Sequence, residues 1–222
     1  MPILNLLIDF DDTLYPLYSQ ACKFFNEIYR VNNPYVPERD FIEGHGSFDE
    51  IYGKYEKLGD GSLVLKKPLD REVILTHFNN LIFSEDFPYT APLPGAVEVL
   101  NRLKVRGDSN SIATKRQPLH QAPLKLYSKT QLPRLIENIF TMGFPNSEPK
   151  IPLALELGAD ILIDDSIKSF LGIGGTKIKG LLMTALWNME IPNILLPQGI
   201  TRVDNWYEAE KRIEEIRVQK RR

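Results

Sequence analysis

Short apolar runs alternate along this chain with longer stretches in which apolar residues recur every three or four positions. The first kind of segment predicts a buried strand and the second predicts a helix. Candidate strands end near residues 8, 114 and 163, and a helical pattern from Pro92 to Gly107 lies between the first two. The second half continues as alternating helix and strand over 132–140, 151–157, 161–163, 180–185, 194–196 and 206–218. This alternation favours an α/β fold, a three-layer Rossmann-like parallel sheet with helices on both faces.

Residues 15–91 lie between the first two predicted strands and are expected to form a helical insert. Helical patterns cover 16–30, 40–58 and 69–83, and two prolines and the turn 59–62 interrupt them. We therefore predict two domains, which are an α/β core formed by 1–14 and 92–222 and a small helical cap formed by 15–91.

The composition fits a folded protein of this class that needs no covalent crosslinks. At 222 residues, 43% of them hydrophobic, the chain can form one core and a subsidiary cap. Its single cysteine, Cys22, excludes an internal disulfide. The first residues contain no basic segment before the apolar ones, and no apolar run approaches the roughly 20 residues of a membrane span. A formal net charge of -2 gives no general attraction to nucleic acid or membranes, so we expect a cytoplasmic protein with neither as a partner.

Three carboxylates and a hydroxyl follow the first predicted strand. Because side chains alternate along a strand and its continuation, Asp9, Asp11 and Thr13 can face one way while Phe10 and Asp12 face the other. Two carboxylates this close repel each other at low dielectric unless a cation neutralises them or one holds a proton. A hard divalent cation such as Mg2+ meets that need. The alternative is an aspartate-rich turn whose threonine caps the next helix.

A second acidic pair, Asp164 and Asp165, follows the predicted strand 161–163. The carboxyl ends of neighbouring parallel strands meet at one edge of an open α/β sheet, which is where such sheets bind ligands. Two acidic strand ends in one chain therefore favour a shared site over an isolated turn.

The acidic segments resemble motifs of the haloacid dehalogenase (HAD) superfamily of Mg2+-dependent phosphohydrolases. The first motif of that family is a hydrophobic strand followed by DxDxT or DxDxV, and the last is an acidic pair. Between them the family has a hydroxyl residue after the second strand and a lysine before the acidic pair. The matching residues, in chain order, are Asp9, Asp11, Thr13, Thr114, Lys150, Asp164 and Asp165. The resemblance implies the HAD core fold and a helical C1-type cap inserted after the first motif.

The same resemblance implies a hydrolytic reaction with two catalytic aspartates. Asp9 would attack the substrate phosphorus and become a transient aspartyl phosphate, and Asp11 would serve as acid and then as base. Thr114 and Lys150 would bind the phosphoryl oxygens. The alternatives are Lys115 and Arg116 for Thr114, and Lys115 and Lys129 for Lys150.

The cofactor implied by the resemblance is Mg2+. A carboxylate oxygen of Asp9, the main-chain carbonyl of Asp11 and a carboxylate oxygen of Asp164 would hold it. Asp165 would not bind the metal directly. It would orient either a water on the metal or Lys150.

The C-terminal third is also similar to the 5'(3')-deoxyribonucleotidase subgroup, which implies a nucleoside monophosphate as one candidate substrate. The similarity rests on 160–165, on a strand that leads to Asn188, and on the Trp-containing segment 202–206. The chain departs from the subgroup at 12–13, where Gly-Val is usual, and at 114–116, where Thr-Ser-Pro is usual.

We therefore expect a Mg2+-dependent phosphomonoester hydrolase for a small phosphorylated metabolite, with a 5'-nucleotidase as the first candidate. A phosphatase for sugar phosphates or another small metabolite is the enzymatic alternative, and a non-catalytic binding protein built on the same fold is the alternative from a different class. A dehalogenase is disfavoured. That branch of the superfamily uses no metal, whereas Asp11 and the pair Asp164 and Asp165 favour one.

Overall fold

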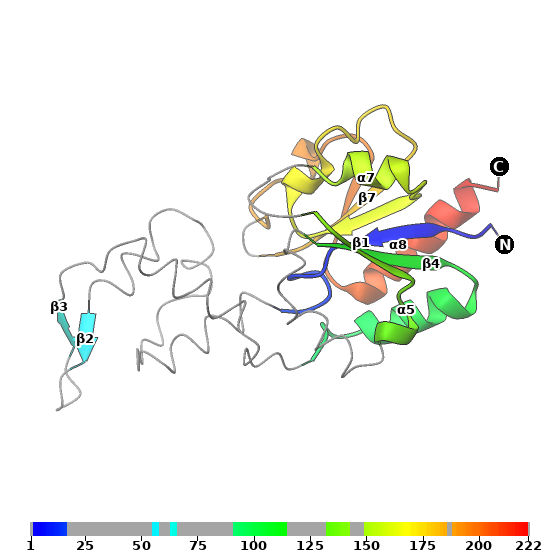
Figure 1. Cartoon of the computed structure of the whole chain (residues 1–222). Coiled ribbons are helices and arrows are strands. Elements are labelled where there is room, and N and C mark those ends of the chain that lie inside the picture. The colour runs from blue at the N-terminus through cyan, green and yellow to red at the C-terminus, as the bar shows by residue number, and fades with distance from the viewer. Residues whose placement is uncertain are drawn as a thin grey trace. The chain divides into compact units, whose positions relative to one another are not determined.

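The apolar runs that follow one another along the chain pair into one six-stranded sheet. The computed structural model describes residues 2–16, 55–57, 63–65, 91–114, 132–142, 149–185 and 188–221. The strand order is β5-β4-β1-β6-β7-β8, and every neighbouring pair is parallel. The strands are β1 (Asn5–Ile8), β4 (Ser109–Thr114), β5 (Asn138–Thr141), β6 (Ile161–Asp164), β7 (Lys179–Met183) and β8 (Ile200–Val203). The predicted parallel α/β sheet is confirmed (Figure 1).

Helices cover both faces of the sheet. They are α5 (Ala96–Val105), α7 (Ile151–Glu156) and α8 (Trp206–Gln219), joined by the 3-10 turns η1 (Leu132–Arg134), η2 (Ile167–Phe170) and η3 (Asn193–Leu195). Figure 1 shows α7 on one side of the sheet and α5 and α8 on the other. The two helices that share a side are linked by an ion pair of 2.7 Å between Arg102 and Glu210.

Side chains that alternate along the central strands pack against the helices on both faces of the sheet. Leu7 and Leu162 lie in one apolar cluster with Ile151 and Ala154 of α7, so this set of strand positions faces α7. The adjacent strand residues, such as Ile8, are equally buried and point to the opposite face. Burial on both faces explains why residues 6–8 of β1 and 161–163 of β6 are apolar throughout rather than alternating.

The last helix begins at a clear capping signal. Asn205 is the N-cap of α8, and its side-chain oxygen accepts a hydrogen bond of 3.0 Å from the main-chain N–H of Glu208. Trp206, in the first turn, is fully buried. The cap therefore fixes where the helix starts and places the indole beside the carboxyl ends of the strands.

The chain divides into two compact units, Met1–Pro16 with Ala91–Arg222, and Leu17–Thr90. In the second unit the structure describes the antiparallel pair β2 (Tyr55–Lys57) and β3 (Leu63–Leu65), which flanks the predicted turn. The helical pattern expected over 40–58 is thus replaced by a strand at its end, since a short apolar repeat fits either structure. The rest of the expected helical cap lies outside the described residues.

Two details of the second half also differ from the pattern. The apolar residues 194–196 fall mostly in η3, because Pro192 and Pro197 flank them and exclude a central strand. The edge strand β8 follows instead at Ile200–Val203, where only two of four residues are apolar. The segment 132–140 splits between η1 and β5.

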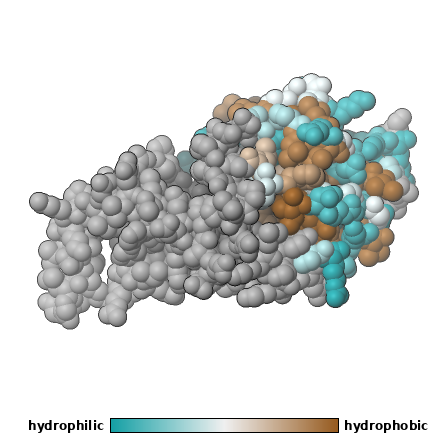
Figure 2. Space-filling view, viewed as in Figure 1, coloured by the Kyte–Doolittle hydropathy of each residue, from teal (hydrophilic) through white to brown (hydrophobic). Residues whose placement is uncertain are grey.

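The visible surface of the larger unit mixes apolar and polar side chains. Figure 2 shows hydrophobic residues interspersed with hydrophilic ones among the residues that are coloured. Val105 and Ile194 are 80% and 91% exposed. Exposed apolar residues that are scattered in this way are normal for a folded surface. No helix among the described residues is both long and apolar enough to cross a membrane.

Candidate active site

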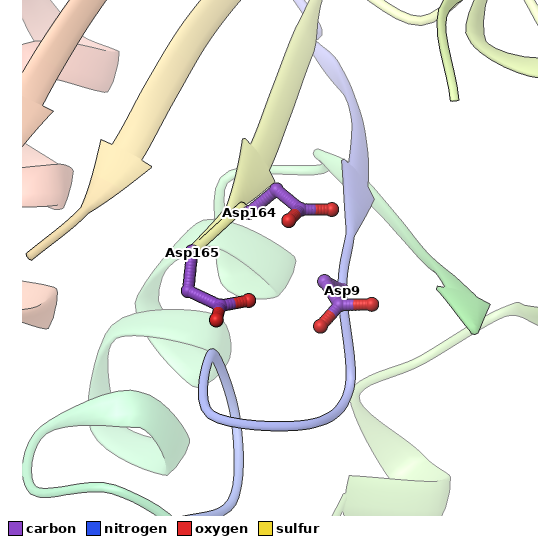
Figure 3. A group of neighbouring side chains, drawn as sticks. All are labelled: Asp9, Asp164 and Asp165. Carbon is purple, nitrogen blue, oxygen red and sulfur yellow. The ribbon is translucent and has the colours of Figure 1, made fainter. Parts of the chain in front are cut away.

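Three carboxylates meet where two central strands end. Asp9 directly follows β1, Asp164 is the last residue of β6, and Asp165 comes next. The strands are neighbours, and the main-chain N–H of Asp9 donates a hydrogen bond of 2.9 Å to the carbonyl of Ile163. One carboxylate oxygen from each aspartate lies within 4.8 Å of the others. Figure 3 shows the three side chains gathered in the space between the two strand ends.

A buried lysine lies against this cluster. Lys150 is the N-cap residue of α7, and its main-chain N–H donates to the carbonyl of Ser169 at 2.9 Å. Its Nζ donates to a carboxylate oxygen of Asp9 and lies 2.7 Å from Oδ2 of Asp164. The side chains of Lys150 and Asp164 are each 1% exposed. Lys150, predicted from its position in the chain, thus reaches Asp9, whereas the alternatives Lys115 and Lys129 lie outside the described residues.

Burial and mutual repulsion dominate the electrostatics of the cluster. Burial raises the pKa of Asp9 to about 7, with the charges of Asp164 and Asp11 adding to the rise and Lys150 opposing it. Burial likewise raises the pKa of Asp165 well above its usual value, and Asp164 and Asp9 add to it. For Lys150 burial acts to lower the pKa, but the two carboxylates outweigh it and raise the pKa above the usual range. Among the described residues the site therefore holds a stable ammonium and an excess of carboxylates.

The chain turns sharply after Asp9 instead of continuing the strand. Asp12 has a left-handed backbone, with φ of 55°. The main-chain N–H groups of Leu14 and Tyr15 both donate to the carbonyl of Phe10, at 3.0 and 3.1 Å. The expected strand-like alternation of side chains therefore fails beyond Asp9, because the left-handed residue reverses the chain.

The turn brings Thr13 back to the acidic cluster. Its hydroxyl donates to Oδ1 of Asp165 at 3.3 Å, and its main-chain carbonyl accepts a hydrogen bond of 2.8 Å from the indole N–H of Trp206. Thr13 and Trp206 are both fully buried. Asp11 lies in the same turn, where its main chain forms an isolated β-bridge with Tyr15. Its carboxylate is not part of the three-carboxylate group.

No protein-family model matches this chain, and no curated protein matches it in sequence. Solved structures match its fold. A HAD-superfamily hydrolase of subfamily IA from Geobacter sulfurreducens is 14% identical, with a TM-score of 0.58 over 96% of each chain. The chain has the HAD-hydrolase fold. A predicted phosphoglycolate phosphatase from Haemophilus somnus is 16% identical, with a TM-score of 0.62 over 95% of this chain and 98% of that one. A mutant of CbbY from Rhodobacter sphaeroides, in complex with xylulose-(1,5)bisphosphate, is 14% identical. Its TM-score is 0.55 over 93% of this chain and 96% of that one.

Within the HAD fold, Thr114 also lies at the carboxyl edge of the sheet. It is the last residue of β4, the strand next to β1 on the side opposite β6. Its side chain is 3% exposed, and its carbonyl accepts a hydrogen bond of 2.8 Å from the main chain of Met142. The hydroxyl residue, the lysine and the acidic residues expected from the sequence are thus all at or beside one edge of the sheet. Lys115 and Arg116 lie outside the described residues.

Trp206 also contacts this site, although the sequence patterns named it only as part of the segment 202–206 and gave it no role there. Its indole binds the turn that carries Asp11 and Thr13, although 193 positions separate Trp206 from Thr13. The signal that could have located it is the Asn205 cap with Glu208 three residues later, which marks the start of a helix at the carboxyl edge.

Proposed function

We propose that this protein is a Mg2+-dependent phosphomonoester hydrolase that acts on a small phosphorylated metabolite. The observation that carries the proposal is the contact between the Lys150 ammonium and the carboxylates of Asp9 and Asp164 at adjacent strand ends. This arrangement combines a buried potential nucleophile, a fixed positive charge and further carboxylates for a metal. A strand-end turn with no chemical role would gain nothing from burying these charges.

The residues present fit a magnesium ion. All the potential ligands among the described residues are hard oxygen donors, which Mg2+ prefers. Among the described residues three carboxylates lie around one ammonium, so a cation would neutralise the excess negative charge. Asp9 and Asp164 would hold the ion with the main-chain carbonyl of Asp11, and Asp165 would orient either a water on the metal or Lys150. When bound, Mg2+ would neutralise charge on the phosphoryl group and polarise its oxygens.

Asp9 is the proposed nucleophile. Its carboxylate oxygen would form a bond to phosphorus as the bond from phosphorus to the alcohol oxygen breaks, which leaves an aspartyl phosphate. Asp11 would give a proton to the departing alcohol oxygen and would then take one from the water that attacks the intermediate. The second step releases inorganic phosphate and restores both carboxyl groups.

Lys150 and Thr114 would bind the oxygens of the transferring phosphoryl group. Lys150 has a second task, because its charge opposes the effect of burial on the pKa of Asp9 and so keeps more of that carboxylate ionised for attack. Thr114 would donate a hydrogen bond from the end of β4.

The fold matches support our proposal for the substrate class more than the C-terminal resemblance does. The matching structures include a predicted phosphoglycolate phosphatase and a CbbY mutant in complex with xylulose-(1,5)bisphosphate. We therefore favour small phosphorylated carboxylic acids and sugars over nucleotides. The nucleotidase assignment rests on the sequence similarity of residues 160–206, part of which lies outside the described residues.

The test is Mg2+-dependent phosphate release from a substrate panel. The panel contains phosphoglycolate, sugar mono- and bisphosphates, nucleoside 5'- and 3'-monophosphates and p-nitrophenyl phosphate, with Asp9→Asn as the blank and a chelator as the metal control. Release from sugar phosphates or phosphoglycolate that needs both Asp9 and Mg2+ supports the proposal. A preference for nucleotides would keep the mechanism and reject the substrate class, and no release above the blank would reject both.

A further inference from the structure

One buried amide joins the acidic turn to the end of the next strand. The side chain of Asn188, 1% exposed, donates two hydrogen bonds of 2.7 Å, to the main-chain carbonyls of Asp165 and Met183. Met183 is the last residue of β7, and Asp165 follows β6. The amide therefore spans the carboxyl ends of two adjacent strands, next to the proposed metal site.

Every hydrogen-bonding position of this amide is used. Its oxygen accepts from the main-chain N–H of Ala185 at 3.2 Å and from Nη1 of Arg202 at 2.5 Å. Because two partners are carbonyls and two are donors, the orientation of the amide is determined by its neighbours. An aspartate of the same shape could not donate to either carbonyl, so the site requires an amide rather than only a side chain of this size.

Arg202 fixes Asn188 from the edge strand β8. Its guanidinium donates to the carbonyls of Asn188 and Ile191, at 2.9 and 2.8 Å, and to the side chain of Asn193 at 2.9 Å. Arg202 thus holds residues 188–193 to β8. A planar guanidinium with several fixed donors suits this task better than a lysine.

We infer that Asn188, supported by Arg202, is a positioning residue that sets the main chain of Asp165 so that Asp164 and Asp165 are placed for metal binding. The inference rests on the proposed function, because it assigns a role within that metal site. Removing Asn188 leaves the carbonyl of Asp165 without this donor and frees the turn to move. Neighbours that orient metal ligands in this way typically change metal affinity by about 10- to 100-fold.

The test compares Asn188→Ala with a matched variant, Asn110→Ala. Asn110 is also a fully buried asparagine that donates to two main-chain carbonyls, of Leu135 and Leu100, but it lies opposite Leu6 near the start of β1. Mn2+ affinity is measured on the metal-free proteins by electron paramagnetic resonance. The Mg2+ concentration for half-maximal hydrolysis of p-nitrophenyl phosphate is measured in parallel, below the unfolding temperature of each variant.

We expect the Mn2+ Kd and the half-maximal Mg2+ concentration of Asn188→Ala to rise about tenfold or more, with kcat largely recovered at saturating Mg2+. Asn110→Ala should lose stability but keep the wild-type metal affinity. If Asn188→Ala does not fold, Arg202→Met tests the same network and should raise both metal constants by a smaller factor.

Each contrary result has a distinct meaning. A wild-type Mn2+ Kd in folded Asn188→Ala, or in Arg202→Met where that variant replaces it, would overturn this inference and leave the proposed function intact. An equal loss of affinity in Asn110→Ala would also overturn it, by showing a general effect of destabilisation. A wild-type protein that binds no Mn2+ would overturn the proposed function and this inference together.

Discussion

Replacing Lys150 by methionine is the sharpest test of the charge balance in the site. Methionine keeps a flexible side chain of similar length and removes the ammonium that contacts Asp9 and Asp164. The side chains of Lys150 and Asp164 are each only 1% exposed, so water cannot replace the lost charge without opening the structure. The variant therefore leaves buried carboxylates without their counter-charge.

The expected cost can be estimated from the burial. Removing one partner of a buried ion pair destabilises a protein by about 3–5 kcal/mol. Asp9 can partly escape this cost by binding a proton, because burial already holds its pKa at about 7 and the loss of Lys150 raises it further. We therefore expect a loss of about 3 kcal/mol at about pH 8 in the absence of metal, and a smaller loss at about pH 5.5.

The assay is urea unfolding followed by tryptophan fluorescence, at both pH values, with and without Mg2+. Mg2+ should recover part of the loss, because it supplies positive charge to the same carboxylates. The control is Arg217→Met, which breaks another buried ion pair, in which Nη1 of Arg217 lies 2.8 Å from Oδ1 of Asp108. Its loss of stability should not respond to Mg2+. An unfolding free energy of Lys150→Met equal to that of the wild type, or a loss identical with and without Mg2+, would refute the reasoning.

Three further results are expected. Asp9→Asn should abolish phosphate release while circular dichroism shows an intact fold, and normal turnover would exclude the covalent mechanism. Because burial raises the folded pKa of Asp9 from 3.8 to about 7, its ionisation costs the metal-free protein stability as pH rises through that window. Asp9→Asn should therefore be more stable than the wild type at about pH 8 and not at about pH 4, measured by thermal unfolding without metal; a pH-independent difference would contradict this. Trp206→Phe keeps one aromatic ring but loses the hydrogen bond to Thr13 and part of a fully buried side chain, so it should cost about 2–4 kcal/mol in urea unfolding; an unchanged midpoint would contradict this.

The sequence predicts the parts of the fold and site whose signals are local. Asp9 and Asp164 are recognisable because each follows an apolar run, and the parallel pairing of β1 and β6 then brings them together. Lys150 is recognisable only through the family resemblance, as a lysine that precedes a short helix and the second acidic strand. These positions depend only on where strands and helices end.

Other features depend on contacts between distant segments or on weak local patterns. The left-handed Asp12 ends the expected alternation of side chains, and no neighbouring residue marks it beforehand. The bond from Asn188 to Asp165 requires β6 and β7 to be adjacent and in register. The apolar pattern does not predict the edge strand β8, because an edge strand needs few apolar residues. The more apolar η3 segment has the pattern of a strand instead.

The position of β1 has a consequence for synthesis of the chain. This strand precedes all the others in its sheet, yet Leu7 is paired with Ser111 on one side and Leu162 on the other. At about 5–20 residues per second, a ribosome needs roughly 8 to 30 s between making β1 and making β6. Until β4 is made this apolar strand has both edges unpaired, and until β6 is made it has at least one, which is the condition that favours pairing with another chain. The incomplete nascent chain, more than the finished protein, is therefore the form that needs protection from aggregation.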